Sequence, residues 1–240
     1  MILIAGPCVM ESEEHVLKMA YVLTDIASHH GVDFYFKASW DKANRTSGDS
    51  YRGVDLKKGV RILERVKSAC GCLVTTDVHE CWQIPPLEGV VDLFQIPALL
   101  SRQTSLIVDA AATGKPINIK KGQCMTNWDV GKASQKAEQV GCPEIMVTER
   151  GTSYGRGEVV VDMRNLVHLQ YGIVPATVLF DATHTCGGDS RLVSPLAKAA
   201  VAVGVDGLFI ECHDNPIQAL CDGQNMITPL ELNELLEEVC

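Results

Sequence analysis

Short apolar runs recur along the whole chain and alternate with longer segments in which apolar residues repeat at helical spacing. Apolar runs of this length are typical of buried strands. The eight runs cover residues 2–5, 34–36, 73–75, 93–96, 117–119, 145–147, 177–180 and 207–210. The helical pattern is clearest at residues 13–27, 56–68, 104–112, 133–140, 195–203 and 230–239.

This alternation predicts a single α/β domain covering residues 1–240, since no linker, charge block or low-complexity tract interrupts it. Eight strand–helix units in a chain of this length favour a (β/α)8 TIM barrel. A doubly wound open sheet is the rival fold, but it normally carries a glycine-rich turn after its first strand. Gly6-Pro7-Cys8 is not such a turn. We therefore predict a barrel with its active site at the carboxyl ends of the strands.

Polar or ionisable residues follow every predicted strand, whereas the junctions that lead from helix to strand are unremarkable. These residues are Cys8, the segment 37–45, Asp77 and His79, Gln95 and Arg102, Lys120 and Lys121, Glu149 and Arg150, Asp181 and His184, and Glu211 and His213. A purely structural barrel gives no reason for this bias toward one end. An enzyme does, because barrel enzymes build their active sites from these loops.

The segment after the second strand carries the strongest chemical signal. It combines three cations with four neutral donors: Lys37, Lys42, Arg45, Ser39, Asn44, Thr46 and Ser47. Such a set suits multiply charged oxyanions, because Arg supplies a planar fork of donors and Lys a point charge. A basic loop can also be ordinary solvated surface. Here the whole chain is acidic, with a net charge of −9, and other strands are followed by similar residues, so we predict an anion-binding site.

The composition narrows the class of partner. An acidic chain lacks the basic face that nucleic acids and anionic membranes require, which leaves small molecules as the expected partners. No apolar run approaches the length of a membrane span, and the first residues lack the basic start of a signal peptide. We therefore expect a cytoplasmic protein whose ten cysteines are thiols.

Taken in order along the chain, the motifs after the strands resemble those of the 3-deoxy-D-manno-octulosonate 8-phosphate (Kdo-8-phosphate) synthase family. They include Ala5-Gly-Pro-Cys8, Asp41-Lys-Ala-Asn-Arg-Thr-Ser47, Thr75-Thr-Asp-Val-His-Glu80, Gln95-Ile-Pro-Ala98, Lys120-Lys-Gly-Gln123, Thr148-Glu-Arg-Gly151 and Asp181-Ala-Thr-His184. The resemblance covers nearly the full length. It implies a homotetrameric barrel without an organic cofactor, which condenses phosphoenolpyruvate with arabinose 5-phosphate and water, releases phosphate and serves lipopolysaccharide biosynthesis.

The resemblance also implies roles for individual residues. Phosphoenolpyruvate would be held by Lys42, Lys120, Arg150 and the backbone N–H of Ala98, with help from Lys37. Arabinose 5-phosphate would be held by Asn44, Arg45, Thr46 and Gln95, and by Arg102 across a subunit boundary. Lys42, Asp77 and His184 are the expected catalytic residues. Either Asp77 or a metal-bound water would direct the water that adds to the substrate.

The same family implies a divalent metal site formed by Cys8, His184, Glu211 and Asp222. A thiolate, an imidazole and two carboxylates suit Zn²⁺, Fe²⁺ or Mn²⁺. Metal-dependent members carry Cys after the first strand, where metal-independent members carry Asn. The tripeptide Cys221-Asp222-Gly223 resembles the metal-independent pattern, so the two signals disagree. We expect a metal site, because loss of a ligand matters more than a change beside one.

Three departures from the family pattern leave alternatives open. About ten residues of a loop over the site are missing after Cys186, either because the loop is short or because a mobile segment was left out of the sequence. The segment Tyr154-Gly-Arg-Gly-Glu158 replaces a different family motif. No hairpin precedes the first strand.

Two rival functions remain. One is a related synthase that uses erythrose 4-phosphate, although such enzymes typically carry Lys-Pro-Arg where this chain has Lys42-Ala-Asn-Arg45. The other is a catalytically silent barrel that serves as a binding module.

Overall fold

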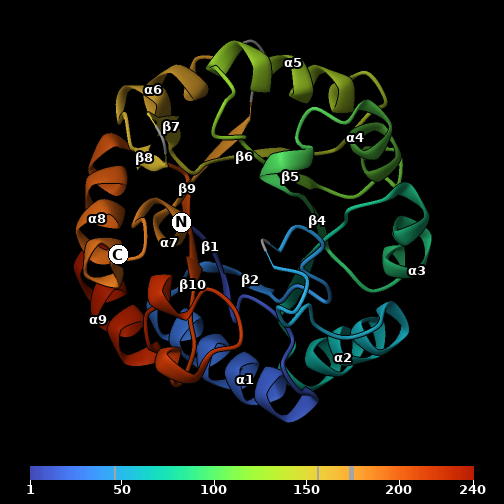
Figure 1. Cartoon of the computed structure of the whole chain (residues 1–240), viewed down its shortest axis with the longest axis vertical. Helices are drawn as coiled ribbons and strands as arrows, with labels where there is room; N and C mark the ends of the chain where they lie inside the picture. Colours follow the sequence, from blue (N-terminus) through green and yellow to red (C-terminus); the bar gives the residue numbers. More distant parts are fainter. Residues whose placement is uncertain (46, 156, 173–175) are drawn as a thin grey trace.

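The chain forms the predicted TIM barrel. We describe a computed structural model, in which residues 1–45, 47–155, 157–172 and 176–240 are placed. Parallel strands close into a barrel in the order β1-β10-β9-β6-β5-β4-β3-β2, with helices around it (Figure 1). The barrel strands are β1 (Ile2–Gly6), β2 (Asp33–Lys37), β3 (Leu73–Asp77), β4 (Leu93–Ile96), β5 (Ile117–Lys120), β6 (Ile145–Glu149), β9 (Thr177–Asp181) and β10 (Gly207–Glu211). All eight coincide with the apolar runs.

The helices include all six predicted segments and three that the pattern did not predict. Their bounds are α1 (Glu13–His30), α2 (Leu56–Cys70), α3 (Ile84–Glu88), α4 (Thr104–Ala111), α5 (Asn127–Glu138), α6 (Arg164–Gln170), α7 (Ala182–Thr185), α8 (Val193–Val203) and α9 (Pro229–Val239). The unpredicted helices α3, α6 and α7 are too short to show a helical period. α5 starts six residues earlier than predicted, because Thr126 and Asp129 form a capping box that begins the helix at Asn127.

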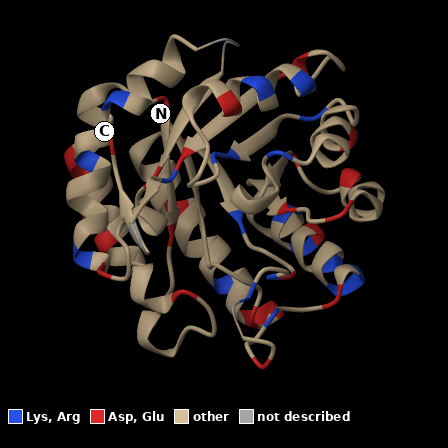
Figure 2. Ribbon diagram, turned by 45° about the horizontal axis from the view of Figure 1, so that its top comes forward, with Lys and Arg blue, Asp and Glu red and all other residues tan. Residues whose placement is uncertain are grey.

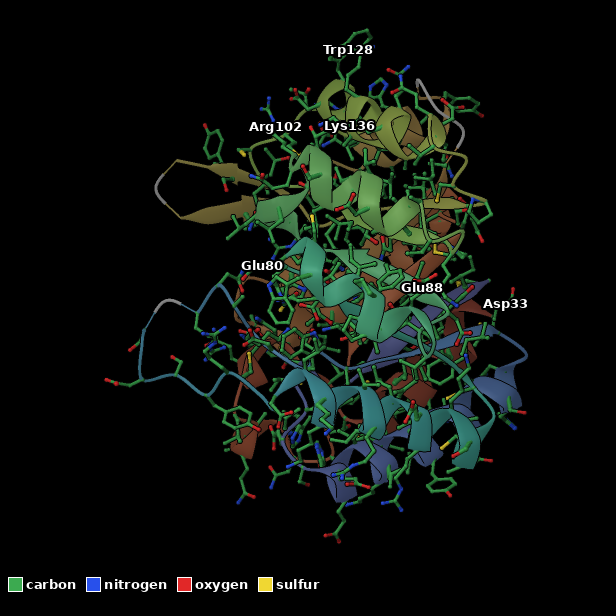
Figure 3. The ribbon with its side chains drawn as sticks, turned by 90° about the vertical axis from the view of Figure 1, so that its right-hand side faces the viewer. Asp33, Glu80, Glu88, Arg102, Trp128 and Lys136 are labelled. Atoms are coloured by element: carbon green, nitrogen blue, oxygen red, sulfur yellow. The ribbon has the colours of Figure 1, made fainter. Side chains whose placement is uncertain are left out.

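A short hairpin was also missed. It consists of β7 (Thr152–Tyr154) and β8 (Glu158–Val160), which pair antiparallel outside the barrel. Figure 3 shows this hairpin and the loop after β2 projecting beyond the same end of the barrel, whereas Asp33, at the start of β2, lies at the opposite end. None of the helices in the described ranges combines the length and the apolar character that a bilayer crossing demands.

The barrel interior is mainly apolar near the strand starts and polar or charged near the strand ends. Near the strand starts a buried cluster fills it, formed by Ile4, Leu93, Met146, Leu179 and Phe209. Side chains two positions apart on a strand face the same side. A residue two positions after an inward-facing residue therefore also points inward, but nearer the carboxyl end of the strand. The inward-facing residues at this end include Lys37, Gln95, Lys120, Asp181 and Glu211. All five are buried.

Gly6 lets the first two strands approach closely at this end. A Cβ atom on Gly6 would lie 2.0 Å from the carbonyl oxygen of Lys37, so no other residue fits without a backbone shift. The close approach brings the segment after β1 against the end of β2, where Lys37 Nζ donates to the carbonyl oxygen of Cys8 at 3.1 Å. One glycine thus fixes the relative position of two predicted site residues.

Candidate active site

A cavity of about 450 Å³ opens at the carboxyl ends of the strands, within the ring of helices. Figure 2 shows Lys and Arg side by side with Asp and Glu on the strands and loops at the centre of the barrel. The predicted site residues that line the cavity are Lys37, Lys42, Asn44, Arg45, Asp77, Gln95, Ala98, Lys120, Arg150, His184, Glu211 and Asp222. Residues from seven barrel strands and their loops therefore converge on one space.

Three predicted residues stand apart from this lining. Cys8 is fully buried next to it, and its Sγ lies 3.2 Å from Asp222 Oδ2. Arg102 is exposed at the outer side, where its carbonyl oxygen accepts a hydrogen bond from Lys136 at 3.3 Å (Figure 3). Thr46 lies outside the described residues, as does Arg156 of the hairpin segment.

Lys120 is a buried cation at the inner end of the cavity. Its Nζ lies 2.6 Å from Asp181 Oδ2 and 3.1 Å from the ring centroid of Phe209. Burial lowers the pKa of Lys120 to about 8, although Asp181 opposes the shift. Burial alone would raise the pKa of Asp181, but His184 and Lys120 outweigh it and lower that pKa. Lys120 therefore releases its proton at a pH only slightly above neutral.

Lys37 and Glu211 form a second buried ion pair, with Nζ 3.2 Å from Oε1. Burial alone would raise the pKa of Glu211, but Lys37 and Lys42 outweigh it and lower the pKa. Oε2 of Glu211 is buried without a hydrogen bond from any residue in the described part of the chain. A carboxylate held ionised with one free oxygen is suited to bind a cation.

Asp77 and Lys42 are two oppositely charged residues that line the cavity. Burial alone would raise the pKa of Asp77, but a hydrogen bond from His79 and the charges of Lys37 and Lys42 lower it. Burial alone would lower the pKa of Lys42, but Cys8, Glu211 and Asp77 raise it well above its usual value. Both groups therefore keep their charge at neutral pH.

His184 is oriented by the residue that starts its own helix. Asp181 caps α7 by accepting from the backbone N–H of His184 at 2.8 Å, and its other oxygen lies 2.8 Å from His184 Nδ1. A carboxylate on one ring nitrogen leaves the other available as a metal ligand. Asp181 thus orients His184 and pairs with Lys120 at once.

Two groups of potential metal ligands meet at Asp222. One consists of Cys8, Cys221 and Asp222, the other of His184, Glu211 and Asp222, and in each the ligand atoms lie within 4.8 Å of one another. Burial raises the pKa of the Cys8 thiol first, and Cys221 and Glu211 raise it further. The two groups contain all four predicted ligands, and the free oxygen of Glu211 is consistent with an ion there.

Sequence reasoning gave no role to four residues that complete the site: His79, Asp181, Phe209 and Cys221. Asp181 was detectable, because it ends a predicted strand and precedes His184 by three residues. Phe209 was not, because its place under Lys120 depends on the closure of the barrel. His79 hydrogen-bonds Asp77, with Nε2 3.2 Å from Oδ2.

The loop after His184 is short. Residues 186–189 connect α7 directly to a 3-10 turn at Ser190–Leu192. Gly188 donates its backbone N–H to Asn225 Oδ1 at 2.8 Å, which ties this loop to the segment that carries Asp222.

A larger groove, of about 860 Å³, lies outside the barrel between α5, α6 and the β7–β8 hairpin. Its walls include the aromatic residues Trp128, Tyr154 and Tyr171, which are exposed. It contains none of the predicted site residues, so the ionisable groups place the chemistry in the smaller cavity.

The chain matches known proteins over its full length. The sequence model described as the DAHP synthetase I family matches residues 1–239. A protein of Wolinella succinogenes named 2-dehydro-3-deoxyphosphooctonate aldolase is 48% identical, and the match covers 100% of this chain and 98% of the relative. Proteins of the same name from Cyanothece sp. and Campylobacter jejuni are 47% and 46% identical; each match covers 99% of this chain, and 90% and 96% of the relatives.

Proposed function

Because the chain belongs to the DAHP synthetase I family and full-length relatives carry the octonate aldolase name, we propose that it joins phosphoenolpyruvate to arabinose 5-phosphate. Water is the third reactant, and the products are 3-deoxy-D-manno-octulosonate 8-phosphate and inorganic phosphate. The chain is an enzyme of the transferase class. Its product would enter lipopolysaccharide biosynthesis.

The observation that carries this proposal is the convergence of cations on one cavity of an acidic chain. Lys37, Lys42, Lys120 and Arg150 line its inner part, and Arg45 comes from the loop after β2. We assign Lys42, Lys120, Arg150 and the N–H of Ala98 to phosphoenolpyruvate, with Lys37 beside them. Two anionic substrates held in one cavity can meet in a reactive geometry, which supplies ~7–11 kcal/mol of the barrier.

The loop after β2 supports the choice of the sugar phosphate. Asn44 and Arg45 line the outer part of the cavity, and Gln95 lies buried further in. We assign these residues to arabinose 5-phosphate, with Thr46 as a further candidate. The erythrose 4-phosphate enzymes typically carry Lys-Pro-Arg where this chain has Lys42-Ala-Asn-Arg45, and the amide of Asn44 can donate to a sugar hydroxyl whereas Pro cannot.

The charges in the cavity suit the chemical steps. C3 of phosphoenolpyruvate attacks the aldehyde carbon, water adds at C2, and the C–O bond to phosphate breaks. Lys42 keeps its proton, so it can stabilise the alkoxide that the aldehyde becomes. Asp77 stays ionised and is therefore a weak base, so its role is to orient the water and to stabilise positive charge at C2.

We further propose that a divalent ion binds to Cys8, His184, Glu211 and Asp222. Zn²⁺, Fe²⁺ or Mn²⁺ suits this donor set. When bound, such an ion supplies a Lewis acid that polarises a substrate oxygen. His184 would present one ring nitrogen because Asp181 holds the other, and Lys37 would keep Glu211 ionised.

Arg102 lies on the outside of its own barrel, although the family pattern gives it a phosphate to bind. We infer that it reaches the cavity of a neighbouring subunit in a homotetramer. The groove beside α5 supports an assembly, because its exposed aromatic residues are unusual on a free surface.

One assay tests the main proposal. Phosphate release from phosphoenolpyruvate is measured with arabinose 5-phosphate and, separately, with erythrose 4-phosphate. We expect turnover with the five-carbon sugar to exceed the other by at least tenfold. The reverse preference would support the rival synthase, and no turnover with either sugar would support a silent barrel.

A further inference from the structure

Cys221 contacts a predicted metal ligand on either side. Its Sγ lies 3.3 Å from Cys8 Sγ and 3.2 Å from Asp222 Oδ2. The third side of the triangle, from Cys8 Sγ to Asp222 Oδ2, measures 3.2 Å. Both thiols are buried, with Cys8 0% and Cys221 3% exposed. The three atoms therefore form a nearly equilateral triangle at the wall of the cavity, which Cys221 and Asp222 line.

These spacings match those of atoms bound to one ion. Thiolates bind Zn²⁺ at about 2.3 Å. Two sulfur atoms at that distance from an ion and 3.3 Å apart subtend an angle of about 90° at the ion, as neighbouring ligands do in a five- or six-coordinate site. The separation needs little adjustment for one ion to contact both.

The backbone is shaped to hold both side chains in this place. Asp222 has a φ of 51°, and among the described residues other than glycine no other has a positive φ. Directly after it, Gly223 packs so tightly that a Cβ atom there would lie 2.1 Å from the carbonyl oxygen of Pro216. Consecutive residues 221 and 222 can therefore both direct their side chains toward Cys8.

We propose that Cys221 is a second sulfur ligand of the divalent ion, in addition to the four ligands that the family pattern implies. This inference rests on the metal site proposed above. The donor set then consists of two thiolates, one imidazole and two carboxylates. Soft sulfur donors favour Zn²⁺ and Fe²⁺ over the harder Mn²⁺, so the second thiolate would make the site selective against Mn²⁺.

With Cys221 as a ligand, the Cys221-Asp222-Gly223 motif no longer argues against a metal. From the sequence this tripeptide argued against a metal, because it resembles the metal-independent pattern. In the folded chain its cysteine faces Cys8, which metal-independent members replace by Asn. Cys221 Sγ also accepts a hydrogen bond from Arg45, so the sulfur atom borders the residue assigned to the sugar phosphate.

The test counts sulfur atoms around the bound ion. The full-length protein is loaded with Zn²⁺ for X-ray absorption spectroscopy, and with Co²⁺ for its sulfur-to-cobalt charge-transfer band. We expect two sulfur neighbours in the unchanged protein and one in Cys221→Ser, with about half the charge-transfer intensity. Cys72→Ser is the matched control, because Cys72 is a buried thiol at the opposite end of the barrel, before β3. It should retain both sulfur neighbours.

A second measurement compares affinities by competition with a chromophoric chelator. Cys221→Ser should weaken Zn²⁺ binding by on the order of tenfold or more, and should weaken Mn²⁺ binding less. If Cys221→Ser does not fold, the sulfur count of the unchanged protein still decides the matter.

The outcomes separate this inference from the function proposed above. One sulfur neighbour in the unchanged protein would overturn the role of Cys221 and leave the four-ligand site standing. Failure to bind any of these ions would overturn both the role of Cys221 and the metal site. The phosphate-release assay tests the proposed reaction separately, because it measures turnover and not the ligands of the ion.

Discussion

Lys120 and Asp181 form a buried ion pair, with Nζ 2.6 Å from Oδ2, at the point where the cavity meets the barrel interior. The two residues differ in how far their pKa values lie from neutral pH. Burial lowers the pKa of Lys120 to about 8, whereas the pKa of Asp181 stays below its usual value. Of these two groups, the cation assigned to phosphoenolpyruvate is therefore the one that titrates near physiological pH.

Binding of phosphoenolpyruvate should weaken as the pH rises through about 8. Below that pH Lys120 is protonated and attracts the substrate anion, and above it the charge is lost. We expect kcat/KM for phosphoenolpyruvate to be flat below the pKa and to fall about tenfold per pH unit above it. Steady-state kinetics from pH 6 to 10 measure this; a flat profile up to pH 10 would contradict the assignment of Lys120.

Asp181→Asn should move that decline to lower pH. Asp181 opposes the effect of burial on Lys120, so its removal should lower the pKa of Lys120 further below 8. Asn is a good helix cap, which should preserve α7. Asp189→Asn is the matched control, since Asp189 is an exposed cap paired with Arg191. An unchanged decline in Asp181→Asn would show that the ion pair does not set this pKa.

Arg150→Ala should abolish most turnover while leaving the fold intact. Removing one arm of a charge-assisted anion clamp should cost on the order of 2–4 kcal/mol of transition-state stabilisation. kcat/KM for phosphoenolpyruvate and the circular dichroism spectrum measure the two effects. Arg191→Ala removes an exposed arginine and should change neither. Near-normal kinetics in folded Arg150→Ala would remove Arg150 from the site.

The sequence predicted the barrel and most of the cavity lining for the same physical reason. Buried parallel strands are apolar along their length, so polar residues such as Lys37 and Lys120 mark the positions at which strands end. Barrel closure then places all strand ends on one face. The class of fold and the location of the site follow from this pattern alone.

Pairings across the barrel could not be predicted in the same way. Lys120 and Asp181 are 61 positions apart, and Cys8 and Cys221 are 213 apart. Nothing in the local sequence shows which partner each one meets. The short helices α3 and α6 and the β7–β8 hairpin were missed because they are shorter than the windows in which periodicity can be detected.

Gly6→Ala should destabilise the protein more than an ordinary glycine substitution. The added Cβ would lie 2.0 Å from the carbonyl oxygen of Lys37, which cannot move without parting β1 from β2. We expect a loss of about 3 kcal/mol in the free energy of unfolding. Gly31→Ala is the control, because Gly31 has a φ of 63° but open space around it, and should lose about 1 kcal/mol. Equal losses in urea denaturation would rule out the steric argument.

Metal removal tests the site around Asp222. If Cys8, His184, Glu211 and Asp222 hold a catalytic ion, exhaustive chelation should abolish activity; Zn²⁺ or Fe²⁺ should restore it, and so should Mn²⁺ at a higher concentration. Activity should survive chelation only if the cavity works without an ion. Elemental analysis of the chelated protein supplies the control, because residual metal would account for residual activity.

Cys8→Asn is the sharper form of this test, because it introduces the residue found in metal-independent relatives. Asn is neutral and a poor ligand, so the variant should bind the ion at least tenfold more weakly and lose most of its activity. Cys8 is fully buried and Asn is similar in size, which favours a folded variant. Full activity of Cys8→Asn in chelator would mean that the cavity needs no ion for the reaction.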